Sequence, residues 1–155
     1  MSEPYEEIIE GETLLRFAPT GRHEVICSRL HAQVEASLAN LTSTRLLASR
    51  SIIQLSAGTL FRPDLALVTA ATGKLWLAAE VISSDDHRTD TVIKKAIYED
   101  LNVPRLWMID PRYNNVEVYH ASPYGLKLEG ILAGRETLRE KLLPGLEISA
   151  AELFA

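Results

Sequence analysis

The chain has 155 residues, of which 46% are hydrophobic and 24% are charged, an ordinary composition for a globular protein. This length predicts a single domain over residues 1–155 that can bury a core without disulfides. The formal net charge is −5, which argues against a protein that coats nucleic acid non-specifically, because phosphate binding depends on lysine and arginine. A nuclease with locally placed basic residues remains compatible with this charge.

No apolar run approaches the roughly 20 residues that a membrane helix needs, so we expect no membrane partner. The acidic start, residues 1–7, lacks the apolar segment of a signal peptide. Cys27 is the one cysteine and cannot form an internal disulfide. These features together predict a cytoplasmic protein.

The N-terminal part predicts a hairpin over Ile8–Phe17 that turns at residues 10–12, followed by a helix from His23 to about Leu41. The helix is predicted from apolar residues at helical spacing, namely Val25, Ile26, Leu30, Val34 and Leu38. For His23, near the helix start, we rank a capping or solvated position ahead of a catalytic one. Cys27 lies on the apolar side without an evident base partner, so it is interpreted as core.

The rest of the chain predicts strands with one embedded helix, the pattern of an α/β or α+β domain. The helix spans Arg88–Leu101 and is ended by Asn102 and Pro104. The predicted strands are Ser51–Leu55, Leu60–Thr69, Leu75–Ser83, Arg105–Asp110, Val116–His120 and Leu126–Ile131, with a short closing segment after Leu146.

The central hairpin places two acidic residues in strands that are otherwise apolar on both faces. The loop at residues 70–74 separates the strands, and if the hairpin is symmetric about Thr72, Asp64 lies directly opposite Glu80. Opposed like charges destabilise a sheet, and burying them unpaired costs more still. A hard cation such as Mg²⁺ would resolve both problems. The alternative is a register shifted by one or two residues, which would leave one carboxylate in solvent.

Lys94, on the helix that follows Glu80, is a third candidate. It borders an expected apolar arc, so its stem can lie along the core while its amine reaches toward the sheet; the arc comprises Val92, Ile93, Ala96, Ile97 and Leu101. The alternative is a surface ion pair between Asp90 and Lys94, worth only a few tenths of a kcal/mol. Tyr98, one turn further on, is interpreted as a packing residue ahead of a chemical one.

Between Arg62 and Pro111 these residues form an ordered set with a recognisable spacing. The sequence resembles the Uma-type family of putative restriction endonucleases, a branch of the PD-(D/E)XK superfamily. The likeness extends to both ends of the chain and rests on Tyr5, the run Glu10-Gly11-Glu12, His23, Arg62-Pro63-Asp64, Glu80-Val81-Ile82-Ser83, Asp90, Lys94, Tyr98, Asn102-Val103-Pro104, Trp107, Ile109-Asp110-Pro111, Leu143-Pro144-Gly145-Leu146 and Glu152-Leu153-Phe154.

This resemblance implies an α/β, restriction-endonuclease-like fold, in which helices flank a mixed β-sheet. It implies that Asp64 and Glu80 hold the metal, with the Val81 carbonyl as a further ligand. The lysine that the superfamily usually has two residues after the acid is replaced by Ile82, and its role is implied to pass to Lys94. Ser84 stands where the family often has proline. His23, Asp90 and Tyr98 are candidates for supporting roles.

The activity expected from the resemblance is metal-dependent endonucleolytic hydrolysis of phosphodiester bonds, with DNA as substrate and Mg²⁺ or Mn²⁺ as cofactor. Cleavage of both strands would be simplest in a homodimer. Two alternatives stay open. One is a nucleic-acid-binding or regulatory module with the same fold and little catalysis, and the other is a structural, oligomeric protein.

Overall fold

The computed structural model describes residues 3–83 and 87–155, so the Ser84 position lies outside the described residues. A mixed sheet forms its centre, in the strand order β10-β9-β8-β7-β6-β3. The strands are β3 (Thr44–Leu46), β6 (Leu65–Thr69), β7 (Leu75–Val81), β8 (Arg105–Asp110), β9 (Asn115–Ser122) and β10 (Gly125–Ala133). Within it, β7 and β8 are parallel because the chain crosses between them through a helix.

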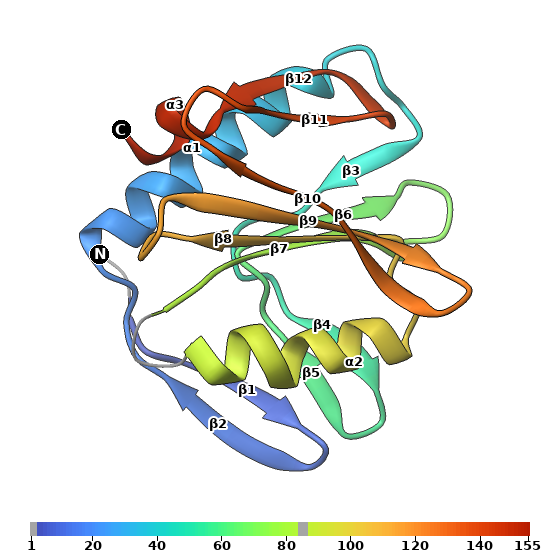
Figure 1. The fold of residues 1–155 in the computed structure, drawn as a ribbon. Coiled ribbons are helices and arrows are strands. Elements are labelled where there is room, and N and C mark those ends of the chain that lie inside the picture. The colour runs from blue at the N-terminus through green and yellow to red at the C-terminus, as the bar shows by residue number, and fades with distance from the viewer. Residues whose placement is uncertain (1–2, 84–86) are drawn as a thin grey trace.

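Helices cover both faces of this sheet. Figure 1 shows α1 (Gly21–Ser37) on one side and the helix of η1 (Thr89–Lys94) and α2 (Lys95–Asp100) on the other. No helix in residues 3–83 or 87–155 combines the length and apolar character needed to cross a membrane. The expected α/β arrangement of a mixed sheet between helices is confirmed.

A second sheet lies beyond α2, in the order β2-β1-β5-β4, and supplies residues to the same region. Its strands are β1 (Tyr5–Ile9), β2 (Glu12–Arg16), β4 (Ile53–Ser56) and β5 (Thr59–Phe61). At the other face, a two-stranded sheet and a last helix pack near α1; they are β11 (Thr137–Glu140), β12 (Leu143–Ser149) and α3 (Ala150–Phe154).

The expected register of the central hairpin is found next to the two acidic residues. Leu65 pairs with Ala79, as symmetry about Thr72 requires, and a bulge shifts the register only near the turn, where Val68 pairs with Leu75. One step beyond the Leu65 pair, the register sets Asp64 opposite Glu80. Both carboxylates are buried, so the alternative with one of them in solvent is wrong.

The strand expected over Leu60–Thr69 is instead two strands in different sheets. The break falls at residues 62–64, where Pro63 has no N–H to donate to a ladder. The chain therefore leaves the small sheet after Phe61 and enters the central sheet at Leu65. This break places Asp64 at a strand end, between the two sheets. The short strand β3 and the strand β11 were not expected from the sequence.

The helix after Glu80 forms as expected, but its predicted apolar face is wrong. Val92 is 53% exposed, whereas Asp90, Lys94 and Tyr98 are buried. The helix opens with the wider π turn of η1, a feature that is frequent at functional sites. It buries polar residues because the two sheets that enclose it present charged partners.

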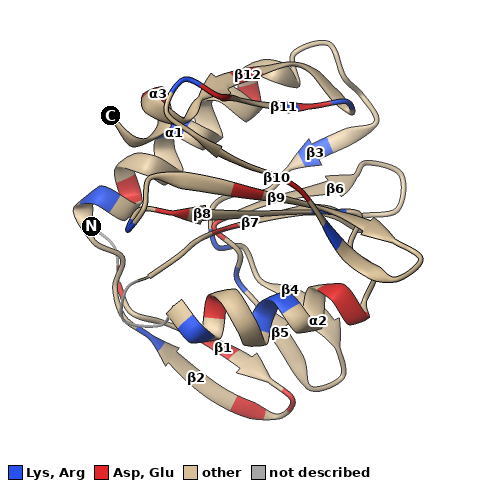
Figure 2. Cartoon of the chain, viewed as in Figure 1, with Lys and Arg blue, Asp and Glu red and all other residues tan. Residues whose placement is uncertain are grey.

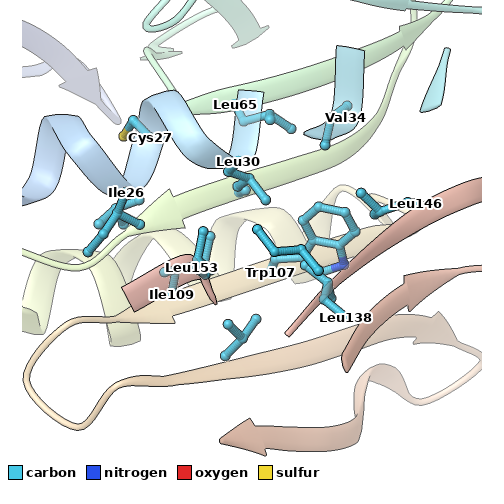
Figure 3. Close-up of a cluster of buried hydrophobic side chains, with 14 of the residues drawn as sticks. Ile26, Cys27, Leu30, Val34, Leu65, Trp107, Ile109, Leu138, Leu146 and Leu153 are labelled. Carbon is cyan, nitrogen blue, oxygen red and sulfur yellow. The ribbon is translucent and has the colours of Figure 1, made fainter. Parts of the chain in front are cut away.

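Two apolar clusters hold the layers together. The larger joins α1 to one face of the central sheet and to the C-terminal strands, and Figure 3 shows Leu30 and Val34 of α1 near Trp107 and Leu146. The smaller includes Phe61, Ala78, Tyr98 and Met108, between the other face of the central sheet, α2 and the small sheet. In the second half of β7, Ala79 and Val81 belong to the larger cluster and Ala78 to the smaller, and Glu80 lies on the same face as Ala78, toward α2.

Candidate active site

Asp64 is fixed at the start of β6 by the neighbouring strand. Its Oδ2 accepts a hydrogen bond of 2.8 Å from the Val81 N–H. Its Oδ1 lies 3.3 Å from the Nε of Arg50, yet within the described part of the chain neither atom has a hydrogen-bond partner. Asp64 is only 4% exposed. Its buried Oδ1 therefore lies near the Arg50 guanidinium without receiving a hydrogen bond from Nε.

Glu80 binds the helix on its side of the sheet. The Lys94 ammonium lies 2.6 Å from Oε2 of Glu80, and the Tyr98 hydroxyl donates to the same oxygen at 2.7 Å. Lys94 is 0% exposed, and its Nζ also lies 4.6 Å from the centre of the Phe61 ring. The surface ion pair between Asp90 and Lys94 is therefore wrong. The Lys94 amine instead reaches the sheet, which is the other arrangement expected from the sequence.

Two residues that were not expected from the sequence, Glu7 and Arg16, complete the network. Glu7 of β1 accepts from Lys94 at 2.8 Å and from the backbone N–H of Arg62 at 2.8 Å. Arg16 of β2 joins Glu7, at 2.7 Å, to Asp90, at 2.8 Å. Lys94 thus lies between a carboxylate of the small sheet, Glu7, and one of the central sheet, Glu80. Figure 2 shows acidic and basic residues close together along its helix and the adjacent strands.

The two carboxylates around Lys94 differ in their affinity for a proton. Burial raises the pKa of Glu80 to about 8, and the charges of Glu7 and Asp64 add to this effect against the attraction of Lys94. Burial also acts on Glu7, but Lys94, the Arg62 N–H and Arg16 outweigh it, and the pKa of Glu7 is lowered. Of the two groups, Glu80 therefore has the higher proton affinity, and the environment of Glu7 favours its charged form.

The ammonium and the phenol in this network keep their protons. Burial works against the charge of Lys94, but Glu80, Glu7 and Asp90 raise the pKa of the ammonium above its usual value. Burial, together with the charge of Glu80, raises the pKa of the Tyr98 hydroxyl well above its ordinary value. Tyr98 therefore donates a hydrogen bond to Glu80, and the Lys94 ammonium lies in an ion-pair contact with the same carboxyl group.

His23 lies in the site and not in solvent, so the solvated reading is wrong. Its backbone N–H is bonded to the Thr20 hydroxyl, which caps α1. Its Nε2 lies 3.1 Å from the Val81 carbonyl oxygen and 3.6 Å from Oδ2 of Asp64. The Val81 carbonyl thus points toward Asp64 and His23, and its second lone pair remains suitable for a ligand role.

Cys27 belongs to the core, as expected, but it has a basic neighbour that the sequence did not reveal. Its Sγ lies 3.6 Å from Nδ1 of His23. Burial, with the charge of Asp64, raises the pKa of the thiol, so it is protonated in this environment. In Figure 3 Cys27 sits at the edge of the apolar cluster, with its sulfur directed away from Trp107.

The donor set around Asp64 fits a hard divalent ion. Carboxylate oxygens and a backbone carbonyl are the ligands that Mg²⁺ and Mn²⁺ prefer. The buried Oδ1 of Asp64 lacks a hydrogen-bond donor among the described residues, and a cation would satisfy it. Asp64 and Glu80 are close enough for the charge of one to raise the pKa of the other, which is the repulsion that a shared cation removes.

A cavity of about 210 Å³ opens beside this cluster. Its wall includes His23, which lies 3.6 Å from Asp64, and three arginines, Arg16, Arg22 and Arg112. Arg112 is held by a bidentate ion pair with Asp110, and Phe17 at the cavity wall is 65% exposed. Arg16 is also paired, with Glu7 and Asp90, and Asp64 and Glu80 are not among the residues that line the cavity.

The mixed sheet with helices on both faces defines a restriction-endonuclease-like α/β fold. The crystal structure of a putative nuclease belonging to DUF820 from Anabaena variabilis ATCC 29413 is similar, with a TM-score of 0.80 and 18% sequence identity over 99% of this chain and 91% of that chain. The family model of Uma2, described as putative restriction endonuclease, matches residues 2–151. The chain belongs to the Uma2 family. None of the curated proteins compared with it matches.

Proposed function

We propose that this chain is a divalent-metal-dependent endonuclease that hydrolyses phosphodiester bonds of DNA. The observation that carries the proposal is the buried contact between Lys94 and Glu80, whose Nζ and Oε2 atoms are 2.6 Å apart. Asp64 lies opposite Glu80 at the start of the neighbouring strand. A lysine and two carboxylates at one strand end are the groups that metal-assisted phosphoryl transfer needs. The family to which the chain belongs supports the same reading.

The metal ligands in this proposal are Asp64, Glu80 and the Val81 carbonyl, and the ion is Mg²⁺ or Mn²⁺. Such an ion supplies charge neutralisation at a non-bridging phosphate oxygen and a lowered pKa for water. Lys94 orients the attacking water or stabilises the charge that develops on the phosphate. Because Glu80 has a raised pKa, it must lose its proton before it can act as a ligand.

The chain's own residues also suit phosphate binding. Arg22 and Arg112 line the cavity beside His23 and are placed to contact the backbone of a nucleic acid. Tyr98 and Asp90 hold the helix in position, and Glu7 with Arg16 positions the Lys94 ammonium. We further propose that residues 1–155 act as one domain in the cytoplasm, as a homodimer that cuts both strands.

The test is cleavage of a plasmid and of labelled oligonucleotides with Mg²⁺, with Mn²⁺ and with a chelator. We expect metal-dependent cutting by the wild type and a loss of at least 100-fold in Asp64→Asn and in Glu80→Gln, each shown to be folded by circular dichroism. Glu152→Gln, on the exposed face of α3, is the matched control and should cut at the wild-type rate.

An inactive wild type that still binds DNA would move the conclusion to a nucleic-acid-binding or regulatory module with this fold. Loss of nucleic-acid binding altogether would favour a structural role. Cutting that survives Glu80→Gln would reject the proposed ligand set.

A further inference from the structure

Three side chains of different chemistry converge beside the proposed Mg²⁺ ligands. One ligand atom from each of His23, Cys27 and Asp64 lies within 4.8 Å of the other two. His23 and Cys27 are four residues apart on α1, so the helix presents both on one face. A sulfur and an imidazole do not serve the oxygen-only set that Mg²⁺ prefers, so this cluster needs its own explanation.

The hydrogen bonding of His23 prepares one ring nitrogen as a ligand. Nε2 lies 3.1 Å from the Val81 carbonyl oxygen, and because a carbonyl oxygen only accepts, Nε2 carries the proton of the neutral ring. The lone pair is then on Nδ1, which lies 3.6 Å from the Cys27 sulfur. A histidine that donates one N–H to a carbonyl and directs the other nitrogen at a second donor is arranged as metal-binding histidines usually are.

A cation of the chain itself lies against these donors. The Arg50 guanidinium has Nη2 at 3.4 Å from Nδ1 of His23 and 4.0 Å from Sγ of Cys27, and Nε at 3.3 Å from Oδ1 of Asp64. It also pairs with Glu24. The Nε–Oδ1 approach is not a hydrogen bond, and both atoms are buried without one in the described part of the chain. The guanidinium therefore occupies His23 and Cys27 through Nη2 but leaves Oδ1 of Asp64 without a hydrogen bond among the described residues.

The position of Arg50 is imposed by its surroundings. Its φ of 57° lies in the left-handed region, which is costly for a residue with a side chain. The backbone is held there by hydrogen bonds with Pro63 and with the Arg62 side chain. The side chain is 14% exposed at the mouth of the cluster, so a turn toward solvent would open the three donors.

We infer that His23 Nδ1, Cys27 Sγ and Asp64 bind a thiophilic divalent ion of the Zn²⁺ class, which displaces the Arg50 guanidinium. Three such protein ligands and a water complete the four-coordinate geometry that Zn²⁺ favours. On binding, the Cys27 thiol becomes a thiolate and its proton passes to solvent. Because Asp64 is shared, and if the proposed nuclease function holds, Zn²⁺ bound here opposes Mg²⁺-dependent cleavage.

The test is titration of the full chain with Co²⁺, followed by near-ultraviolet absorption from thiolate-to-cobalt charge transfer. Cys27 is the one cysteine of the chain, so a thiolate band can come from no other residue, and each variant is first shown to be folded by circular dichroism. We expect one equivalent of Co²⁺ to produce the band and Zn²⁺ to remove it. Cys27→Ser should abolish it, His23→Gln should weaken binding at least tenfold, and the control His120→Gln, on β9, should retain it.

Absence of the band in folded wild type would overturn the inference. The result is separable from the nuclease proposal through Glu80→Gln, which should lose cleavage and keep the band. A band without cleavage in the wild type would support the soft-metal site and reject the nuclease, whereas cleavage without a band would reject this site alone. With both present, Zn²⁺ should inhibit the wild type, and Cys27→Ser should escape that inhibition by at least tenfold.

Discussion

Lys94 carries its charge in a fully buried position, and two carboxylates compensate the loss of hydration of its ammonium group. A lone buried ammonium would lose its proton or unfold its surroundings. Glu7 and Glu80 lie at 2.8 Å and 2.6 Å from Nζ and raise its pKa. The arrangement holds one ammonium in a fixed place beside the candidate metal ligands, which is the preorganisation that electrostatic catalysis requires.

Glu80 makes a specific contribution to stability as a function of pH. Its pKa of about 8 in the folded chain lies above its ordinary value of 4.5, so the folded state holds a proton that the unfolded state releases between these values. The resulting stabilisation is complete below pH 4.5 and is lost as the pH rises through about 8.

We therefore expect the free energy of unfolding of the wild type to fall relative to Glu80→Gln between pH 5 and pH 9, by an amount on the order of 3 kcal/mol. Glutamine stays neutral throughout, and Glu7 is present in both proteins. Urea denaturation at each pH, without metal, measures the difference. A constant difference across this range would show that Glu80 has an unshifted pKa.

The helix of η1 and α2 departs most from what its sequence predicts. Its apolar residues suggested an inward arc at α-helical spacing, yet Ile93 is 37% exposed and Asp90 is 1% exposed. The reason is that the small sheet covers the helix and brings Arg16 to Asp90. Amphipathic spacing identifies the helix but cannot show which face is buried when charged partners lie far away in sequence.

This difference gives contrasting expectations for two substitutions on one helix. Val92→Ala should change the free energy of unfolding by no more than about 0.5 kcal/mol, because the side chain is half exposed. Tyr98→Phe should cost about 1–2 kcal/mol, because it removes the donor to the buried Glu80 carboxylate. Urea denaturation of both variants checks this. A loss at Val92 larger than that at Tyr98 would restore the arc predicted from the sequence.

For the molecule as a whole, contacts between strands that are adjacent in sequence could be predicted. Contacts between segments that are far apart in sequence could not. The hairpin fixes Asp64 opposite Glu80 through local register, so that pairing could be foreseen. Glu7 and Arg16 could not, because strand charges usually face solvent and only the docking of the small sheet buries them. Arg50 belongs to a turn whose left-handed residue carries no glycine or asparagine signal.

The most direct test of the central claim compares Lys94→Gln with Lys95→Gln in single-turnover cleavage of DNA with saturating Mg²⁺. The two lysines are adjacent, but Lys94 is buried against Glu80 and Lys95 lies over the Tyr119 ring. We predict a rate reduced at least 100-fold for Lys94→Gln and within twofold of wild type for Lys95→Gln, with both proteins folded. Equal rates for the two variants, or wild-type cleavage by folded Lys94→Gln, would contradict it.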